Sequence, residues 1–266
     1  MRLHLWDDQQ VGLLIHALCL LPFIENAAAG IAKIREVVRE LRLRTYQLRD
    51  VTAALGHSRC LEAVGLLREF AYDEVLIKQL GEAWINAVAV LDFPESRQLL
   101  LSFVDPEISG LPAGLTFESE DIQAARLAEL ALRDAAIRQR LLQLCTMQLP
   151  ALKRRLLAKV VGMVGTTEAM VAGLSLIDDT AAPQVPYEIW KQLEATFVEH
   201  KPTSAVSNAY TLAPRSANSI RNKLSEMMTM DARRKDSASS LLAQIEVWRL
   251  EHGRPHDEPR NPLFEC

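Results

Sequence analysis

The chain has 266 residues, of which 49% are hydrophobic and 24% are charged, and its formal net charge is -4. This composition excludes a wholly disordered chain, and the small net charge excludes a global field that would attract nucleic acid or anionic lipid. Aromatic residues make up only 6%, while leucine and alanine are plentiful. Such a balance favours helices packed on helices over β-sheets, so the predicted fold class is all-α.

The first apolar run covers residues 11–24 and is interrupted by His16 and Pro22. It is shorter than the roughly 20 residues that span a bilayer. Asp7 and Asp8 precede it, where a secretory signal would carry basic residues. We therefore expect a buried first helix with His16 in its core, no membrane segment and a cytoplasmic location.

The four cysteines are widely spaced along the chain. Cys19, Cys60 and Cys145 lie within helical patterns and are predicted to be reduced, buried thiols, which suits a cytoplasmic protein. Cys266 is expected to be a free terminal thiol.

The basic residues suggest where a partner could bind. Arg35, Arg39 and Arg42 fall on one face of the second predicted helix, and Arg233 and Arg234 lie near the carboxy-terminal hairpin. Acidic residues are interleaved with them, so solvated helix faces with salt links are the simplest interpretation. The alternative is a concave surface that holds an acidic ligand, either protein or nucleic acid.

The clearest helical pattern lies between Leu76 and Leu91, where apolar residues recur at offsets 0, 4, 7, 8, 11, 12 and 15. This spacing predicts one continuous helix. Pro94 suits the first turn of the next helix, and Asp105 with Pro106 ends that helix. The two helices form a hairpin, because neither can bury its apolar stripe alone.

Other hairpins follow the same pattern. The preceding one has helices over 46–55 and 59–72, joined by a turn at residues 56–58, and later ones are predicted over 118–147, 149–177, 187–212 and 216–252. Proline and glycine mark loops near 105–117 and 178–186, and prolines keep the C-terminal tail, 253–266, extended. We therefore expect a single α-solenoid over 1–252, with about six hairpins and a spacing of roughly 30 to 45 residues.

The sequence motifs that could indicate catalysis have the wrong spacing or lie in the wrong structural context. Residues 162–167 lack the lysine of a phosphate-binding loop and read as a helix that ends at Gly165, with Thr166 or Thr167 capping the next. His252, His256 and Cys266 do not complete a zinc site. Asp178 and Asp179 could do acid–base work, although adjacent loop carboxylates more often stabilise a turn. We predict no catalytic residue, no cofactor and no metal, and keep an all-α enzyme with a loop-borne site as an alternative.

The segment 84–96, followed by Leu99 and Leu100, resembles a degenerate HEAT-type repeat. The resemblance implies a right-handed α-solenoid of antiparallel helix hairpins, a HEAT- or armadillo-like superhelix. In bacteria such arrays resemble small scaffolds and the sensor ends of signal-transduction NTPases. It therefore implies a non-enzymatic scaffold or sensor that binds a protein through its concave surface. Alternatives are the C-terminal sensor-like portion of, or a partner to, such an NTPase, and a nucleic-acid-binding protein that uses the arginine face.

Overall fold

The computed structural model describes residues 7–23, 26–39, 43–109, 111, 120–178, 214–230 and 234–252. Every regular element within these ranges is helical, which confirms the all-α prediction for the described part of the chain. The chain divides into two compact units, Met1–Arg126 and Leu127–Cys266, and the boundary falls within helix α8 (Glu120–Arg133).

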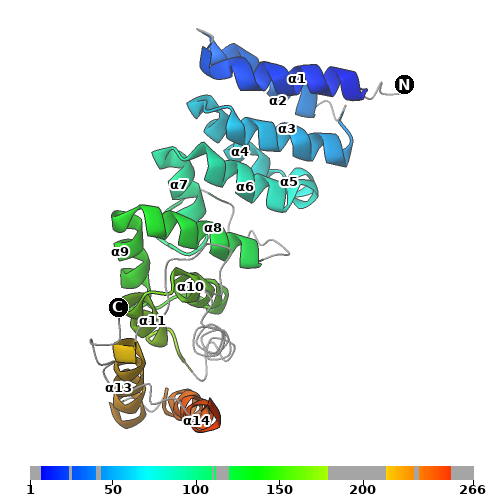
Figure 1. Cartoon of the computed structure of the whole chain (residues 1–266). Coiled ribbons are helices and arrows are strands. Elements are labelled where there is room, and N and C mark those ends of the chain that lie inside the picture. The colour runs from blue at the N-terminus through cyan, green and yellow to red at the C-terminus, as the bar shows by residue number, and fades with distance from the viewer. Residues whose placement is uncertain are drawn as a thin grey trace, which may run out of the picture. The chain divides into compact units, whose positions relative to one another are not determined.

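The first unit contains seven labelled α-helices before α8. They are α1 (Asp8–Leu20), α2 (Ala27–Arg39), α3 (Thr45–His57), α4 (Leu61–Tyr72), α5 (Glu74–Leu80), α6 (Glu82–Leu91) and α7 (Pro94–Leu101), and a short 3-10 helix, η1 (Leu21–Phe23), follows α1. Helix α3 packs against both α1 and α6, while α4 packs against α2 and α7 (Figure 1). The first helices of successive hairpins are thus neighbours, and so are the second helices. Their shared core includes Leu55, Leu66, Leu67, Ile85 and Leu99, all fully buried.

The α3–α6 contact depends on a glycine. Helix α3 continues to His57, so the predicted turn at residues 56–58 was wrong, and the turn lies at residues 58–60 instead. Gly56 is buried within the helix, and a Cβ at this position would lie 2.6 Å from the Cα of Ala87 and 2.8 Å from its carbonyl oxygen. Glycine is therefore used here for close helix approach, and the turn is made elsewhere.

The predicted continuous helix over residues 76–91 was also wrong, because it is broken at Gly81. This residue has φ +51°, a conformation that glycine adopts readily, and it separates α5 from α6. The apolar stripe itself is confirmed on both sides of the break. Leu76, Leu80, Trp84 and Leu91 are buried.

Helix α1 is not the buried helix that its apolar sequence predicts. Only Val11 and Leu18 are buried within it, whereas Leu13 is 66% exposed and Leu20 is 59% exposed. His16 and Cys19 are exposed too, which corrects both expectations of burial. The helix places one apolar edge against α3 and leaves another in solvent.

The second unit contains α9 (Ala135–Leu144), α10 (Ala151–Val164), α11 (Thr167–Leu174), α13 (Pro214–Met230) and α14 (Lys235–His252). Helix α10 ends at Gly165, whose φ is +68°, and the Thr166 side chain accepts a hydrogen bond from the backbone N–H of Ala169. The predicted boundary between these helices is confirmed. Helix α11 contacts α9, α10 and α13, and α13 pairs with α14.

Several predictions lie outside the described residues. They are the loop segments 112–117 and 179–186, the hairpin over 187–212 and the tail 253–266. In the described part of the chain, no helix has both the length and the apolar character needed to cross a bilayer.

Candidate interaction surface

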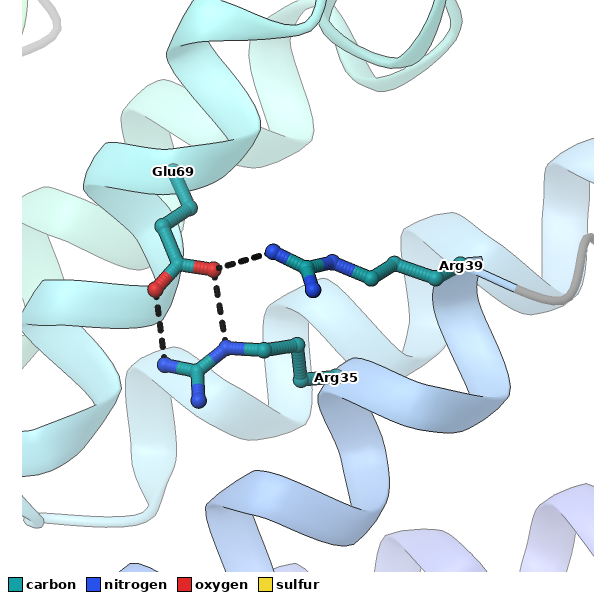
Figure 2. Close-up of polar contacts among 3 residues, drawn as sticks. All are labelled: Arg35, Arg39 and Glu69. Atoms are coloured by element: carbon teal, nitrogen blue, oxygen red, sulfur yellow. Dashed lines mark hydrogen bonds and ion pairs between the residues drawn. The ribbon is translucent and has the colours of Figure 1, made fainter.

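The arginine face of α2 is tied to the next hairpin by an ion-pair cluster (Figure 2). Arg35 forms a bidentate pair with Glu69 of α4: its Nε donates to Oε2 at 2.8 Å and its Nη2 to Oε1 at 2.7 Å. Arg39 approaches the same carboxylate less closely, with Nη2 3.5 Å from Oε2. The spacing of one helical turn, from position 35 to 39, places both guanidinium groups on the same face of α2.

Exposure distinguishes the two arginines. The Arg35 side chain is 33% exposed, whereas that of Arg39 is 73% exposed. Two cations share one carboxylate, so the cluster keeps a positive charge. Arg39 is therefore the more solvent-exposed member of the cluster, while Arg35 joins α2 to α4.

Arg234 has a structural contact. Its Nε donates to the carbonyl oxygen of Ile177 at 2.9 Å, which connects the start of α14 to the segment after α11. Arg42 and Arg233, the other two predicted binding residues, lie outside the described residues.

Arginine side chains also connect other helices. Arg49 Nε on α3 donates to the carbonyl oxygen of Gln79 on α5 at 2.8 Å, and Arg126 Nε on α8 donates to Asn86 Oδ1 on α6 at 2.8 Å. The planar guanidinium suits this role because it offers several donors in a fixed geometry. Arg49 therefore joins α3 to α5, and Arg126 joins α8 to α6.

Asp178 is held in an ion pair. Its Oδ2 lies 3.3 Å from Nη1 of Arg154, and the two side chains are only 17% and 10% exposed, respectively. Arg154 Nη2 also donates to the carbonyl oxygen of Leu149 at 3.1 Å. Asp178 therefore has a structural role, which is to pair with the buried guanidinium group of Arg154. Asp179, its neighbour in the predicted carboxylate pair, lies outside the described residues.

The amino-terminal ends of α1 and α3 are joined through Asp8. Its Oδ1 accepts hydrogen bonds from the Tyr46 hydroxyl at 2.7 Å and from Gln47 Nε2 at 2.9 Å. The Tyr46 bond, and after it the Gln47 bond, lowers the pKa of the Asp8 carboxyl. This network therefore stabilises the ionised form of Asp8 at neutral pH.

The buried thiols are poor nucleophiles. Burial raises the pKa of the Cys145 thiol to about 12. Burial also raises the pKa of Cys60, whose Sγ donates to Glu62 Oε2 at 2.8 Å. A nucleophilic cysteine needs a lowered pKa, so neither thiol has the environment of a catalytic one. Within the described ranges, no group of three or more His, Cys, Asp or Glu side chains could hold a metal ion.

Among the tryptophans, Trp84 has the core position that its apolar stripe predicts. It is fully buried, its Nε1 donates to the carbonyl oxygen of Leu67 at 2.6 Å, and its ring meets that of Phe103 edge to face. Its role is to pack α6 against α4 and the segment after α7. Trp190 and the side chain of Trp248 lie outside the described part of the structure.

The sequence analysis did not identify Glu69 as the partner of Arg35, or Arg154 as the partner of Asp178. Glu69 is separated from Arg35 by 34 positions, so no short-range pattern connects them. The only available signal was the predicted hairpin, which places alternate helices side by side. Arg154 lies among the buried residues of α10, and its burial requires a partner of opposite charge.

Together, these features define a chain whose described residues form helices, several of which are joined by arginine contacts. The family model described as NACHT C-terminal Alpha/Beta 2 matches residues 192–266 of the chain. The described residues of the matched segment form α13 and α14, and the matched family is not one of the HEAT or armadillo families. No curated protein and no solved structure matches the chain.

Proposed function

We propose that this chain is a non-enzymatic helical-repeat module that acts as the sensor portion of, or the partner to, a NACHT-type signalling NTPase in the bacterial cytoplasm. The observation that carries this proposal is the match of residues 192–266 to a NACHT C-terminal family. The family description refers to a segment on the C-terminal side of a NACHT domain, so we assign nucleotide hydrolysis to such a domain and ligand binding to this chain.

The layered helices of the first unit support a binding role. The second helices, α2 and α4, lie side by side and carry the cluster of Arg35, Arg39 and Glu69. In a right-handed solenoid the second helices of the hairpins would line the concave side. We assign the protein ligand to this side, with Arg39 contacting an acidic side chain of that ligand.

Nucleic acid is less favoured as the ligand. A nucleic-acid phosphate backbone is usually bound by several lysine or arginine side chains that are not already paired. Here Arg35 is paired with Glu69, and Arg234 donates to a backbone carbonyl. Binding to duplex DNA or RNA that weakens steeply with added salt would favour the nucleic-acid alternative instead.

The proposal is tested by reconstitution of this chain with candidate NACHT NTPases. The expected result is a stable complex, measured by calorimetry, whose affinity falls about tenfold or more in Arg39→Glu. Lys78→Glu is the matched control, because it makes the same charge change on an exposed position of α5 and is expected to leave the affinity unchanged. Absence of a complex, or NTP hydrolysis by the isolated chain that Asp178→Asn abolishes without unfolding, would contradict the proposal.

A further inference from the structure

The exposed edge of α1 is an unusual surface. Leu13, Leu20 and the adjacent Phe23 are 66%, 59% and 83% exposed, and His16 and Ala17 are exposed between them. The spacings of seven and three residues keep these side chains on one helical face. On no other helix of the described chain do two large exposed hydrophobic residues lie within two turns on the same face.

The opposite edge of α1 is already used within the chain. Val11 and Leu18 are buried, and the helix packs against α3. A helix that is apolar on both sides is characteristic of a buried element, because each apolar edge left in water costs free energy. A second surface is therefore expected to cover the edge formed by Leu13, Ala17, Leu20 and Phe23.

We propose that this second surface is the α1 helix of another copy of the chain, packed antiparallel about a two-fold axis close to Ala17. Two large apolar residues, Leu13 and Leu20, lie on either side of the exposed His16 and Ala17 at the middle of the edge. In an antiparallel pair, Leu13 of one copy lies opposite Leu20 of the other, and the two small alanines allow the helix axes to approach closely. The edge is thus complementary to itself, as a two-fold interface requires.

The distribution of charge along α1 favours an antiparallel orientation of the two helices. No formally charged side chain lies between Gln9 and Phe23, so the two edges do not repel each other. Asp7 and Asp8 lie at the amino-terminal end of each helix. A parallel pair would bring these acidic ends together, whereas an antiparallel pair separates them by roughly 25 Å, about two and a half times the Debye length at 0.1 M salt.

The same charge pattern disfavours a membrane surface as the occupant. Helices that lie on anionic membranes carry lysine or arginine on their polar face. The chain has neither residue between Asp7 and Ala32, and its first helical turn is acidic. A second protein helix is the better match for an uncharged apolar edge.

The size of the edge sets the expected affinity. One helix face is smaller than the roughly 800 Å² that each partner gives to a standard protein interface. The dimer is therefore weak and reversible, with an expected Kd on the order of 10 to 100 μM. It should be detected as a monomer–dimer equilibrium that depends on protein concentration.

The test is sedimentation equilibrium of the full chain from about 1 μM to 500 μM, a range that brackets the expected Kd. Leu13→Lys and Leu20→Glu are each expected to raise Kd about tenfold or more, because each buries an unpaired charge at the contact. The double variant Leu13→Lys/Leu20→Glu is expected to regain dimerisation, since position 13 of one copy faces position 20 of the other. Recovery in the double variant is specific to the antiparallel pairing.

Two controls separate this interface from other effects. Leu152→Glu alters a residue of α10 that is 58% exposed, and it is expected to leave the equilibrium unchanged. In a Cys19→Ser/Cys266→Ser background, Ala17→Cys is expected to form a disulfide between copies, whereas Gln9→Cys, far from the axis, is not. A wild-type chain that stays monomeric at 500 μM, or a dimer that both single variants leave intact while circular dichroism shows native helicity, would overturn the proposal.

Discussion

The carboxylate of Asp8 connects α1 to α3. It accepts hydrogen bonds from Tyr46 and Gln47 of α3, and these bonds lower its pKa in the folded chain. A group with a lowered folded pKa contributes stability above its unfolded pKa and loses that contribution as the pH falls through the folded value. The contribution of Asp8 is therefore present at neutral pH and decreases below about pH 4.

The Asp8→Asn variant tests this dependence. We expect a lower urea midpoint than wild type at pH 6, and a difference that shrinks as the pH is lowered from about 4 towards 2.5. Asp50→Asn is the control, because Asp50 is exposed and the described chain offers its carboxylate no hydrogen bond. A difference between wild type and Asp8→Asn that is constant over this pH range would contradict the assignment.

Gly56 and Gly65 are a matched pair of helical glycines in neighbouring helices. A Cβ at Gly56 would overlap the backbone of Ala87, whereas a Cβ at Gly65 would meet no atom within 4 Å. We expect Gly56→Ala to reduce the free energy of unfolding by about 1 to 3 kcal/mol through overpacking. Gly65→Ala is expected to increase it by roughly 0.5 to 1 kcal/mol, because alanine is the better helix former. Urea unfolding of both variants checks this, and equal effects of the same sign would show that α3 and α6 are not in close contact.

At the scale of elements, the apolar stripes pack the helices together, and ion pairs and hydrogen bonds from arginine then join particular pairs of helices. The α2–α4 connection is the clearest, since Arg35 and Glu69 meet in bidentate geometry. Both side chains are about one third or more exposed, so solvent weakens the pair. We expect a coupling of about 0.5 to 1 kcal/mol at low salt.

A double-mutant cycle measures this coupling. Arg35→Ala, Glu69→Ala and the double variant are compared by urea unfolding at 50 mM and 500 mM NaCl. The coupling is expected to fall at the higher salt, because the pair is partly solvated. The same cycle with Lys33 and Glu36, an exposed pair within α2, should give a smaller coupling. A coupling of zero at both salt concentrations would mean that Arg35 is free to serve a partner.

Much of the helical content could be predicted from the sequence, because apolar residues at helical spacing mark the buried faces. The end of α10 at Gly165 with the Thr166 cap was also predictable, because glycine commonly ends a helix and threonine commonly caps the next. The break at Gly81 was not, since the apolar stripe continues across it in register and only the backbone conformation of glycine interrupts the helix. The exposure of Leu13 and Leu20 could not be predicted either, because periodicity shows that a face is apolar but not whether the fold covers it.

The candidate site was predictable only in part. The sequence indicated Arg35 and Arg39 as residues of one helical face, and the structure places both at Glu69. The pairing partners were not accessible, because contacts between helices far apart in sequence depend on how the hairpins stack. Arg234 illustrates the same difficulty, since its carbonyl acceptor at Ile177 is 57 positions away.

At the scale of the whole molecule, the two compact units are expected to respond separately to mutation. Asp178 lies in the second unit and pairs with the buried Arg154. Asp178→Ala leaves that guanidinium without this carboxylate in a largely buried position, so we expect a loss of about 3 to 5 kcal/mol from the stability of the second unit. The effect should be structural, with no loss of a catalytic activity.

Hydrogen exchange locates this loss. In Asp178→Ala, protection is expected to fall in α10 and α11, while α3 and α6 keep the protection of the wild type. Glu168→Ala changes an exposed carboxylate on α11 and is expected to alter stability by less than about 0.5 kcal/mol. Equal loss of protection in both units would show that the chain unfolds as one cooperative body.

The contact of Gly56 with Ala87 also has an evolutionary consequence. Apolar helix stripes occur in many unrelated proteins and identify relatives poorly, whereas a close backbone approach restricts one particular position. A related chain that keeps the α3–α6 contact must keep a glycine near the end of the first of these helices, because any Cβ there would overlap the backbone of the second. A glycine at this position is therefore a more specific mark of homologues of the first unit than the apolar stripes are.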